Sequence, residues 1–233
     1  MELNAYPHLL AFCNEVKRIL EIPLEDGDTC ESRLCFLSSV LQNQGKGKPG
    51  AGLTGGIFQE SLWKDMFFSQ SPDRFSEPEE KDADYCFDEV PFSHKTIGWR
   101  GNGALALAWS KNPASGLQRT KFNSSMVIAC TRQPKARGIW DGIQMGLYVI
   151  PVDWLKENVE LSSNNKTDSL IEAKYTIQGM QHARATGLHV PLHYDHSAGD
   201  DYSLSYWTAG RSAAVRFRSA GENPPSTLFP PHQ

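Results

Sequence analysis

The sequence predicts an α+β fold in which N-terminal helices pack against a central mixed β-sheet. Two observations support this. Apolar residues recur at helical spacing before residue 70, whereas short apolar runs bounded by turn residues dominate from residue 96 onward. A chain of 233 residues is long enough to bury a sizeable core. We expect a helical region over 1–70, a β-rich core over 91–220 within the same structural unit, and a disordered tail over 221–233.

The N-terminal region is predicted to contain helices separated by a glycine-rich loop. Residues 7–21 carry apolar side chains at helical spacing and end before Pro23. Asp28 or Thr29 is placed to cap a second helix. The glycines and lysines of 45–56 lack the order of a phosphate-binding loop, so a surface loop is expected there. The apolar residues of 57–67 then predict a turn into a third helix.

Residues 70–90 are polar and acidic, and they include two prolines. We expect an exposed loop here, because adjacent like charges without apolar neighbours are usually solvated. Strands are expected after it, with a turn at 100–103 separating the first two. The expected strands are Thr96–Trp99, Ala104–Trp109, Met126–Cys130, Gly146–Val152, Leu188–Tyr194, Tyr202–Thr208 and Ala213–Phe217.

Composition narrows the class of protein. The formal charge of −4 and a pI near 6.0 argue against a broad basic surface, so any contacts with nucleic acid would be local. Five cysteines without a CxxC pair fit a reducing compartment with buried thiols. The sequence shows neither a secretory signal nor an apolar run of the roughly 18 residues that a membrane span needs. These features predict a cytoplasmic protein without a membrane segment.

The most informative stretch for function is 146–195. Leu170–Tyr175 forms a strand-like run in which Glu172 and Lys174 fall on one face, because side chains alternate along a strand. Phosphodiester hydrolysis needs carboxylates that hold a divalent cation and a lysine near the attacking water. Asp153 is a candidate for the second carboxylate, and Asp168 and Asp141 are alternatives to it.

This stretch resembles the PD-(D/E)xK nuclease superfamily over about fifty residues. Pro151 and Asp153 stand where the family has Pro-Asp, with one extra residue between them, and Glu172–Lys174 is an intact ExK. A longer polar loop replaces the usual glycine hairpin. The resemblance implies a Mg²⁺-dependent endonuclease acting on DNA, with Asp153 and Glu172 as metal ligands and catalytic roles for those two residues and Lys174. Gln178 or Gln181 corresponds to a glutamine that some branches carry early in the following helix.

Two other interpretations remain open. His182, His189, His193, Asp195 and His196 form a cluster rich in zinc or iron ligands, and His189, His193 and Asp195 share one strand face, which suggests a metal-dependent hydrolase. His193 is also a candidate general base.

The remaining interpretation is a non-catalytic module that binds nucleic acid or another anionic partner through basic and tryptophan-bearing segments at 99–140 and 211–218. The same histidines and tryptophans equally suit structural roles.

Overall fold

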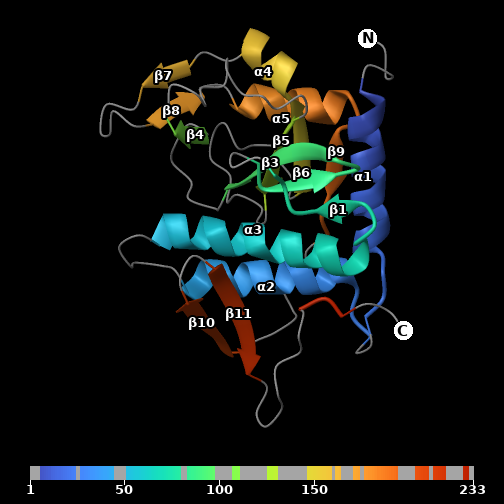
Figure 1. Ribbon diagram of the computed structural model, residues 1–233, viewed down its shortest axis with the longest axis vertical. Coiled ribbons are helices and arrows are strands. Elements are labelled where there is room, and N and C mark those ends of the chain that lie inside the picture. The colour runs from blue at the N-terminus through green and yellow to red at the C-terminus, as the bar shows by residue number, and fades with distance from the viewer. Residues whose placement is uncertain are drawn as a thin grey trace.

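Helices and β-sheets together make up the chain, which confirms the predicted α+β class (Figure 1). The computed structural model describes residues 6–24, 27–44, 51–79, 83–97, 107–110, 125–130, 146–158, 161–163, 170–173, 176–193, 203–209, 212–218 and 228–230. The helices are α1 Pro7–Leu20, α2 Cys30–Gln44, α3 Ala51–Gln70, α4 Val152–Asn158 and α5 Thr176–Ala185. None of the helices in these ranges is long and apolar enough to cross a membrane.

The central sheet has six strands and is mixed, as predicted. Its order is β1-β2-β3-β5-β6-β9, and β3 and β5 are parallel whereas the other neighbours are antiparallel. The strands are β1 Phe75–Ser76, β2 Tyr85–Phe87, β3 Val90–Ile97, β5 Ser125–Cys130, β6 Gly146–Pro151 and β9 His189–Pro191. Two smaller antiparallel sheets consist of β4 Leu107–Ser110, β8 Leu170–Ala173 and β7 Leu161–Ser163, and of β10 Ser203–Ala209 with β11 Ser212–Arg218.

The structure corrects three expectations about the first hundred residues. The glycine-rich segment expected as a loop over 45–56 is helical from Ala51, where α3 begins. Two parts of the segment expected as an exposed loop, Phe75–Ser76 and Tyr85–Phe87, form β1 and β2 of the central sheet, with β1 at its edge. The strands on either side of the expected turn at 100–103 are not partners, because β3 pairs with β2 and β5, whereas β4 pairs with β8.

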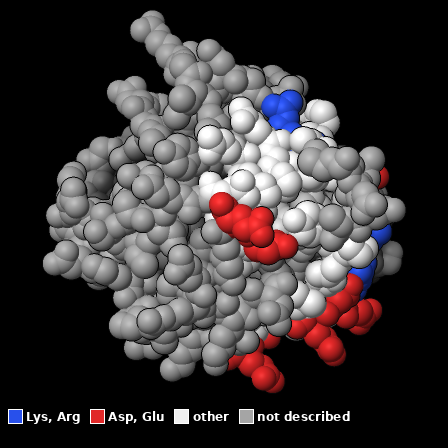
Figure 2. Space-filling view, turned by 90° about the horizontal axis from the view of Figure 1, so that it is seen from above, with Lys and Arg blue, Asp and Glu red and all other residues white. Residues whose placement is uncertain are grey.

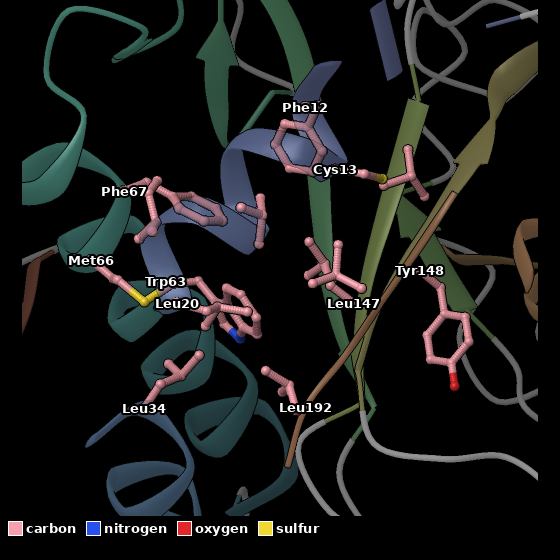
Figure 3. Packing of buried hydrophobic residues seen from close by; sticks show 14 of the residues in the cluster. Phe12, Cys13, Leu20, Leu34, Trp63, Met66, Phe67, Leu147, Tyr148 and Leu192 are labelled. Atoms are coloured by element: carbon pink, nitrogen blue, oxygen red, sulfur yellow. The ribbon is translucent and has the colours of Figure 1, made fainter. Parts of the chain in front are cut away.

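One hydrophobic core joins the N-terminal helices to the central sheet (Figure 3). Phe12 and Cys13 of α1 and Trp63, Met66 and Phe67 of α3 are all buried in it. Leu147 on β6 points toward these helices, whereas its neighbour Tyr148 points to the opposite face of the sheet, and both are fully buried. Both faces of β6 are therefore covered, as expected for its unbroken apolar run.

Helix α1 and the start of α2 lie where the sequence indicates. The spacing of Leu9, Phe12, Val16 and Ile19 places all four on the buried face of α1. Thr29 caps α2, since its Oγ1 accepts a hydrogen bond from the backbone N–H of Ser32 at 3.1 Å. The predictions of both helices are confirmed.

A strained two-residue turn connects β2 and β3. Phe87 pairs with Val90, and both turn residues have positive φ, 47° at Asp88 and 68° at Glu89, which is the conformation of a type I′ hairpin. Arg74 holds the turn, because its Nε donates to Asp88 Oδ1 at 2.9 Å and its carbonyl accepts from the Asp88 N–H at 2.8 Å.

We expect Glu89→Gly to stabilise the protein by up to about 1 kcal/mol. A left-handed conformation costs an L-residue roughly 1–2 kcal/mol, and the greater freedom of glycine in the unfolded chain offsets part of that gain. Urea unfolding followed by circular dichroism measures the change. The matched control is Glu79→Gly, at an exposed position without positive φ, which should be neutral or mildly destabilising. Equal effects at the two positions would contradict strain at Glu89.

Candidate functional site

The residues of the predicted nuclease motif lie on two different sheets. Asp153 is exposed in the first turn of α4, directly after β6 of the central sheet, and its Oδ1 accepts a hydrogen bond from the Trp154 N–H at 2.9 Å. Glu172 lies on β8, where it pairs with Ala108 of β4 and Ser162 of β7. The strands β6 and β8 therefore do not form the adjacent pair that the motif implies. Lys174, Asp168 and Asp141 lie outside the described residues.

Asp153 does lie close to α5, the helix that follows Glu172. Its charge acts on His182 of α5, although burial lowers the pKa of His182 more than Asp153 raises it. The His182 ring stacks on Trp154 with centroids 4.7 Å apart. Gln178 is exposed on the same helix. The structure thus brings Asp153 near the Gln178-bearing helix, and the site itself stays a prediction.

The predicted histidine cluster consists of residues with different environments. His189 stacks on Tyr148 at 4.4 Å, and burial, with smaller contributions from Arg184 and Lys17, lowers its pKa to about 4. His193 is exposed, and its backbone N–H donates to Glu31 Oε1 at 2.6 Å. Asp195 and His196 lie outside the described residues. Across the described ranges, no group of three or more His, Cys, Asp or Glu side chains is arranged to hold a metal ion.

A different group of charged side chains meets between α3 and the β2–β3 hairpin. Asp84 lies immediately before β2, and Lys95 lies on β3 with its Nζ 3.6 Å from Asp84 Oδ2. Glu60, on α3, interacts electrostatically with both Asp84 and Lys95. We call Glu60, Asp84 and Lys95 the α3–hairpin site. Two carboxylates and one lysine are the groups that the sequence predicted around Glu172.

The hairpin fixes the position of the Asp84 carboxylate. Asp84 Oδ2 accepts two hydrogen bonds, one from the His94 backbone N–H at 2.6 Å and one from the Ser93 hydroxyl at 3.3 Å. Ser93 and Lys95 share one face of β3 by period-two alternation, and His94 takes the other. Asp84 is only 20% exposed, so its charge interacts with its neighbours more strongly than a solvated carboxylate would.

The opposite face of this hairpin is anchored in the core. His94 is 1% exposed, and its Nδ1 is hydrogen-bonded to the Tyr85 hydroxyl at 3.1 Å. Burial, with a smaller effect of Lys95, lowers the pKa of His94 to about 3, so the ring is neutral. The Trp63 ring of α3 lies 5.9 Å from the His94 ring. These contacts hold α3 and the hairpin against one another, and thereby set the distance between Glu60 and Asp84.

The Glu60 carboxyl group has a pKa well above its ordinary value. The pKa of Glu60 is raised to about 7, chiefly by burial and next by the nearby Asp84 carboxylate, whereas Lys95 and Lys64 lower it. Lys64 lies one turn along α3 from Glu60, and its Nζ pairs with Glu77 Oε2 at 3.1 Å. A carboxyl group that titrates near neutral pH beside a second carboxylate is a feature of many functional sites, and structural ion-pair networks also produce it.

Comparison with protein-family models, with curated proteins and with solved structures finds no match to this chain. The assignment of a site therefore depends on geometry and chemistry alone.

The sequence prediction missed the α3–hairpin site because its residues come from segments interpreted as a turn, a helix and a solvated loop. Acidic residues at 77–89 resemble ordinary surface charge when read along the chain. One signal was available: large side chains recur at every second position, at Tyr85 and Phe87 and again at Phe92 and His94, on either side of Asp88 and Glu89. This pattern predicts a half-buried hairpin, and it would have placed Asp84 and Lys95 on neighbouring strands.

The described part of the face in Figure 2 does not display the basic patch that a binding module requires. Seen from above the view of Figure 1, the described part of the surface carries more acidic than basic side chains (Figure 2). Of the basic residues proposed for binding, Arg132, Lys135 and Arg137 lie outside the described residues, whereas Arg216 and Arg218 lie on β11.

Proposed function

We propose that the protein is a Mg²⁺-dependent nuclease whose reaction centre is the α3–hairpin site. The observation that carries this proposal is the ion pair of Asp84 and Lys95, 3.6 Å apart, with the partly buried Glu60 carboxyl of α3 in electrostatic contact with both. A phosphodiester substrate is proposed because two carboxylates and a lysine are the groups that metal-dependent phosphodiester hydrolysis needs. The choice of DNA comes from the sequence resemblance around Glu172, which is a separate argument from the geometry of this site.

The donor set suits magnesium. Mg²⁺ prefers hard oxygen ligands and is commonly held by one or two carboxylates, with water in its remaining positions. Glu60 and Asp84 supply the two carboxylates, and one of them must release a proton before both can bind. When bound, Mg²⁺ supplies charge stabilisation at a phosphoryl oxygen and lowers the pKa of a bound water.

The side chains of the chain itself take distinct roles in this proposal. Lys95 holds a positive charge beside the carboxylates, where it orients the attacking water or stabilises negative charge developing on the phosphate. Ser93 and the His94 N–H keep Asp84 in one orientation. Lys64, paired with the exposed Glu77, is placed on the same helix face to attract the phosphate backbone.

The motif predicted from sequence is the competing location for the same chemistry. There, Mg²⁺ would be held by Asp153 or Asp168 and by Glu172, with Lys174 at the water and Gln178 in support. Its support is the intact ExK in the sequence, with Glu172 on β8 and the helix α5 after it. The separation of β6 and β8 into different sheets favours the α3–hairpin site.

A matched pair of lysine variants distinguishes the two locations. Nicking of supercoiled plasmid DNA in Mg²⁺ is measured for the wild type, Lys95→Met and Lys174→Met, with circular dichroism to verify folding. We expect Lys95→Met to lower the rate by at least about 10²-fold and Lys174→Met to leave it within a few-fold. The opposite pattern, together with a loss in Glu172→Ala, would assign the chemistry to the ExK motif. No Mg²⁺-dependent cleavage by the folded wild type would end the nuclease proposal.

Mg²⁺ binding and cleavage should strengthen as pH rises toward 7 and then level off. The raised pKa keeps Glu60 protonated below about pH 7, and the metal must displace that proton. With a pKa of about 7, binding should release about 0.9 proton at pH 6 and about 0.1 at pH 8. Calorimetric titration with Mg²⁺ in buffers of different ionisation enthalpy counts these protons.

Glu60→Gln is the control for this pH dependence. The variant should bind Mg²⁺ more weakly and without the release of a proton between pH 6 and 8. Proton release that persists unchanged in Glu60→Gln would show that another group is responsible.

A further inference from the structure

The C-terminal segment Leu228–Pro230 is docked on helices α2 and α3. Phe229 is fully buried and Leu228 is 8% exposed, so both belong to the main hydrophobic core. In Figure 1 this segment is the short red stretch near the C-terminus, beside α2. A disordered tail was expected over 221–233, and these three residues depart from that expectation because two large apolar side chains find a buried site.

Side chains of α2 and α3 bind the main chain of this segment at four points. The Leu228 N–H donates to Asp65 Oδ2 at 2.8 Å, and the Leu228 carbonyl accepts from Arg33 Nη1 at 3.3 Å. Gln70 Nε2 donates to the carbonyls of Phe229 at 2.8 Å and Pro230 at 3.1 Å. Main-chain hydrogen bonds combined with buried sites for apolar side chains are the two elements from which proteins build peptide recognition.

The side chains that bind the C-terminal segment belong to a different part of the chain. Arg33, Asp65 and Gln70 belong to α2 and α3, which pack on each other and on α1. Their partner residues lie far along the chain, with a separation of 159 positions between Gln70 and Phe229. Affinity in such an arrangement comes from the contacts, and the covalent link raises only the effective concentration of the ligand.

We propose that Arg33, Asp65 and Gln70 form a peptide-binding site, the tail site, whose ligand is a Leu-Phe-Pro segment supplied by the chain's own C-terminus. The four main-chain contacts hold the bend at Leu228 and Phe229 in one conformation, and the buried Phe229 ring selects the sequence. Proline is compatible with position 230. Among the described contacts, the main chain of Pro230 is bound through its carbonyl, so the site does not need the N–H that proline lacks. This inference does not depend on the proposed nuclease activity.

The test separates the tail from the folded chain. A protease recognition sequence is inserted between Glu222 and Asn223 of the full chain, and the purified protein is cleaved. We expect fragment 223–233 to stay with the body through gel filtration. A synthetic wild-type 223–233 peptide in excess should displace it, whereas a peptide with Phe229→Ala should need at least about 10² times the concentration. The body is wild type in this comparison, so its folding is not affected.

Variants of the body complete the test. Gln70→Ala removes two of the four main-chain hydrogen bonds and should weaken the fragment by about 10-fold. Ser69→Ala is the matched control, because its hydroxyl bonds only to Asp65 and Met66 carbonyls within α3, and it should leave the affinity unchanged. Loss of the wild-type fragment on gel filtration, or equal displacement by the Phe229→Ala peptide, would overturn the proposal.

Discussion

Asp84→Asn should abolish Mg²⁺-dependent cleavage, with a fall in rate of at least about 10²-fold, while the protein stays folded. The substitution preserves the shape of the side chain and the oxygen that accepts the His94 N–H at 2.6 Å, but it removes the charge that faces Lys95 and Glu60. A metal held by two carboxylates loses one of them. Plasmid cleavage and Mg²⁺ titration measure the two losses separately.

A second consequence concerns the proton on Glu60. The Asp84 carboxylate is one cause of the raised pKa of Glu60, so its neutralisation should lower that pKa. The residual pH dependence of Mg²⁺ binding should then move to lower pH. A purely structural role for Asp84 would not produce this shift.

Asp88→Asn is the matched control at the other end of β2. Asp88 also pairs with a cation, Arg74, but it lies in the β2–β3 turn, away from Glu60 and Lys95. Asparagine tolerates the positive φ of 47° at this position. We expect cleavage to be unchanged within a few-fold. Equal losses in Asp84→Asn and Asp88→Asn would indicate that hairpin stability, rather than metal binding, governs the rate.

The sequence predicted most accurately the elements whose burial pattern is local. α1 follows from apolar spacing over four turns, and its observed bounds, Pro7–Leu20, differ from the expected 7–21 by one residue. β5 and β6 follow from short apolar runs. In each case the residues that decide the structure are contiguous, so periodicity alone identifies the element.

Elements that depend on distant partners were harder to predict. α3 begins at Ala51, inside a glycine-rich segment, although glycine is unfavourable in helices. The second half of α3 is fixed by burial of Leu62, Trp63, Met66 and Phe67. Because helix propagation is cooperative, extending this helix toward its N-terminus costs little additional free energy. The α3–hairpin site has the same origin, since Glu60 and Asp84 approach only after α3 packs on the sheet.

Phe12→Ala should be the most destabilising single substitution that we propose, at about 4 kcal/mol. Phe12 is fully buried, and its ring stacks on Phe92 at 4.6 Å and meets Phe87 edge-on at 5.4 Å. Removal of a buried phenyl ring costs roughly 3–5 kcal/mol in lost transfer free energy and residual cavity. Aromatic pairs add about 0.5–1.5 kcal/mol beyond burial. This is a large part of the roughly 5–15 kcal/mol that stabilises a typical domain.

Urea unfolding of Phe12→Ala, Phe12→Leu and Phe68→Ala tests the reason for this loss. Leucine at position 12 restores much of the volume without the ring, so we expect about half of the alanine effect. Phe68 is only partly buried at the edge of the core beneath Lys64, so its truncation should cost about 1–2 kcal/mol. Because Phe12 connects α1 to Phe92 and Phe87 of the hairpin, its loss should also raise hydrogen exchange in β2 and β3. A Phe12→Ala effect no larger than that of Phe68→Ala would show that α1 does not fix the hairpin that carries Asp84 and Lys95.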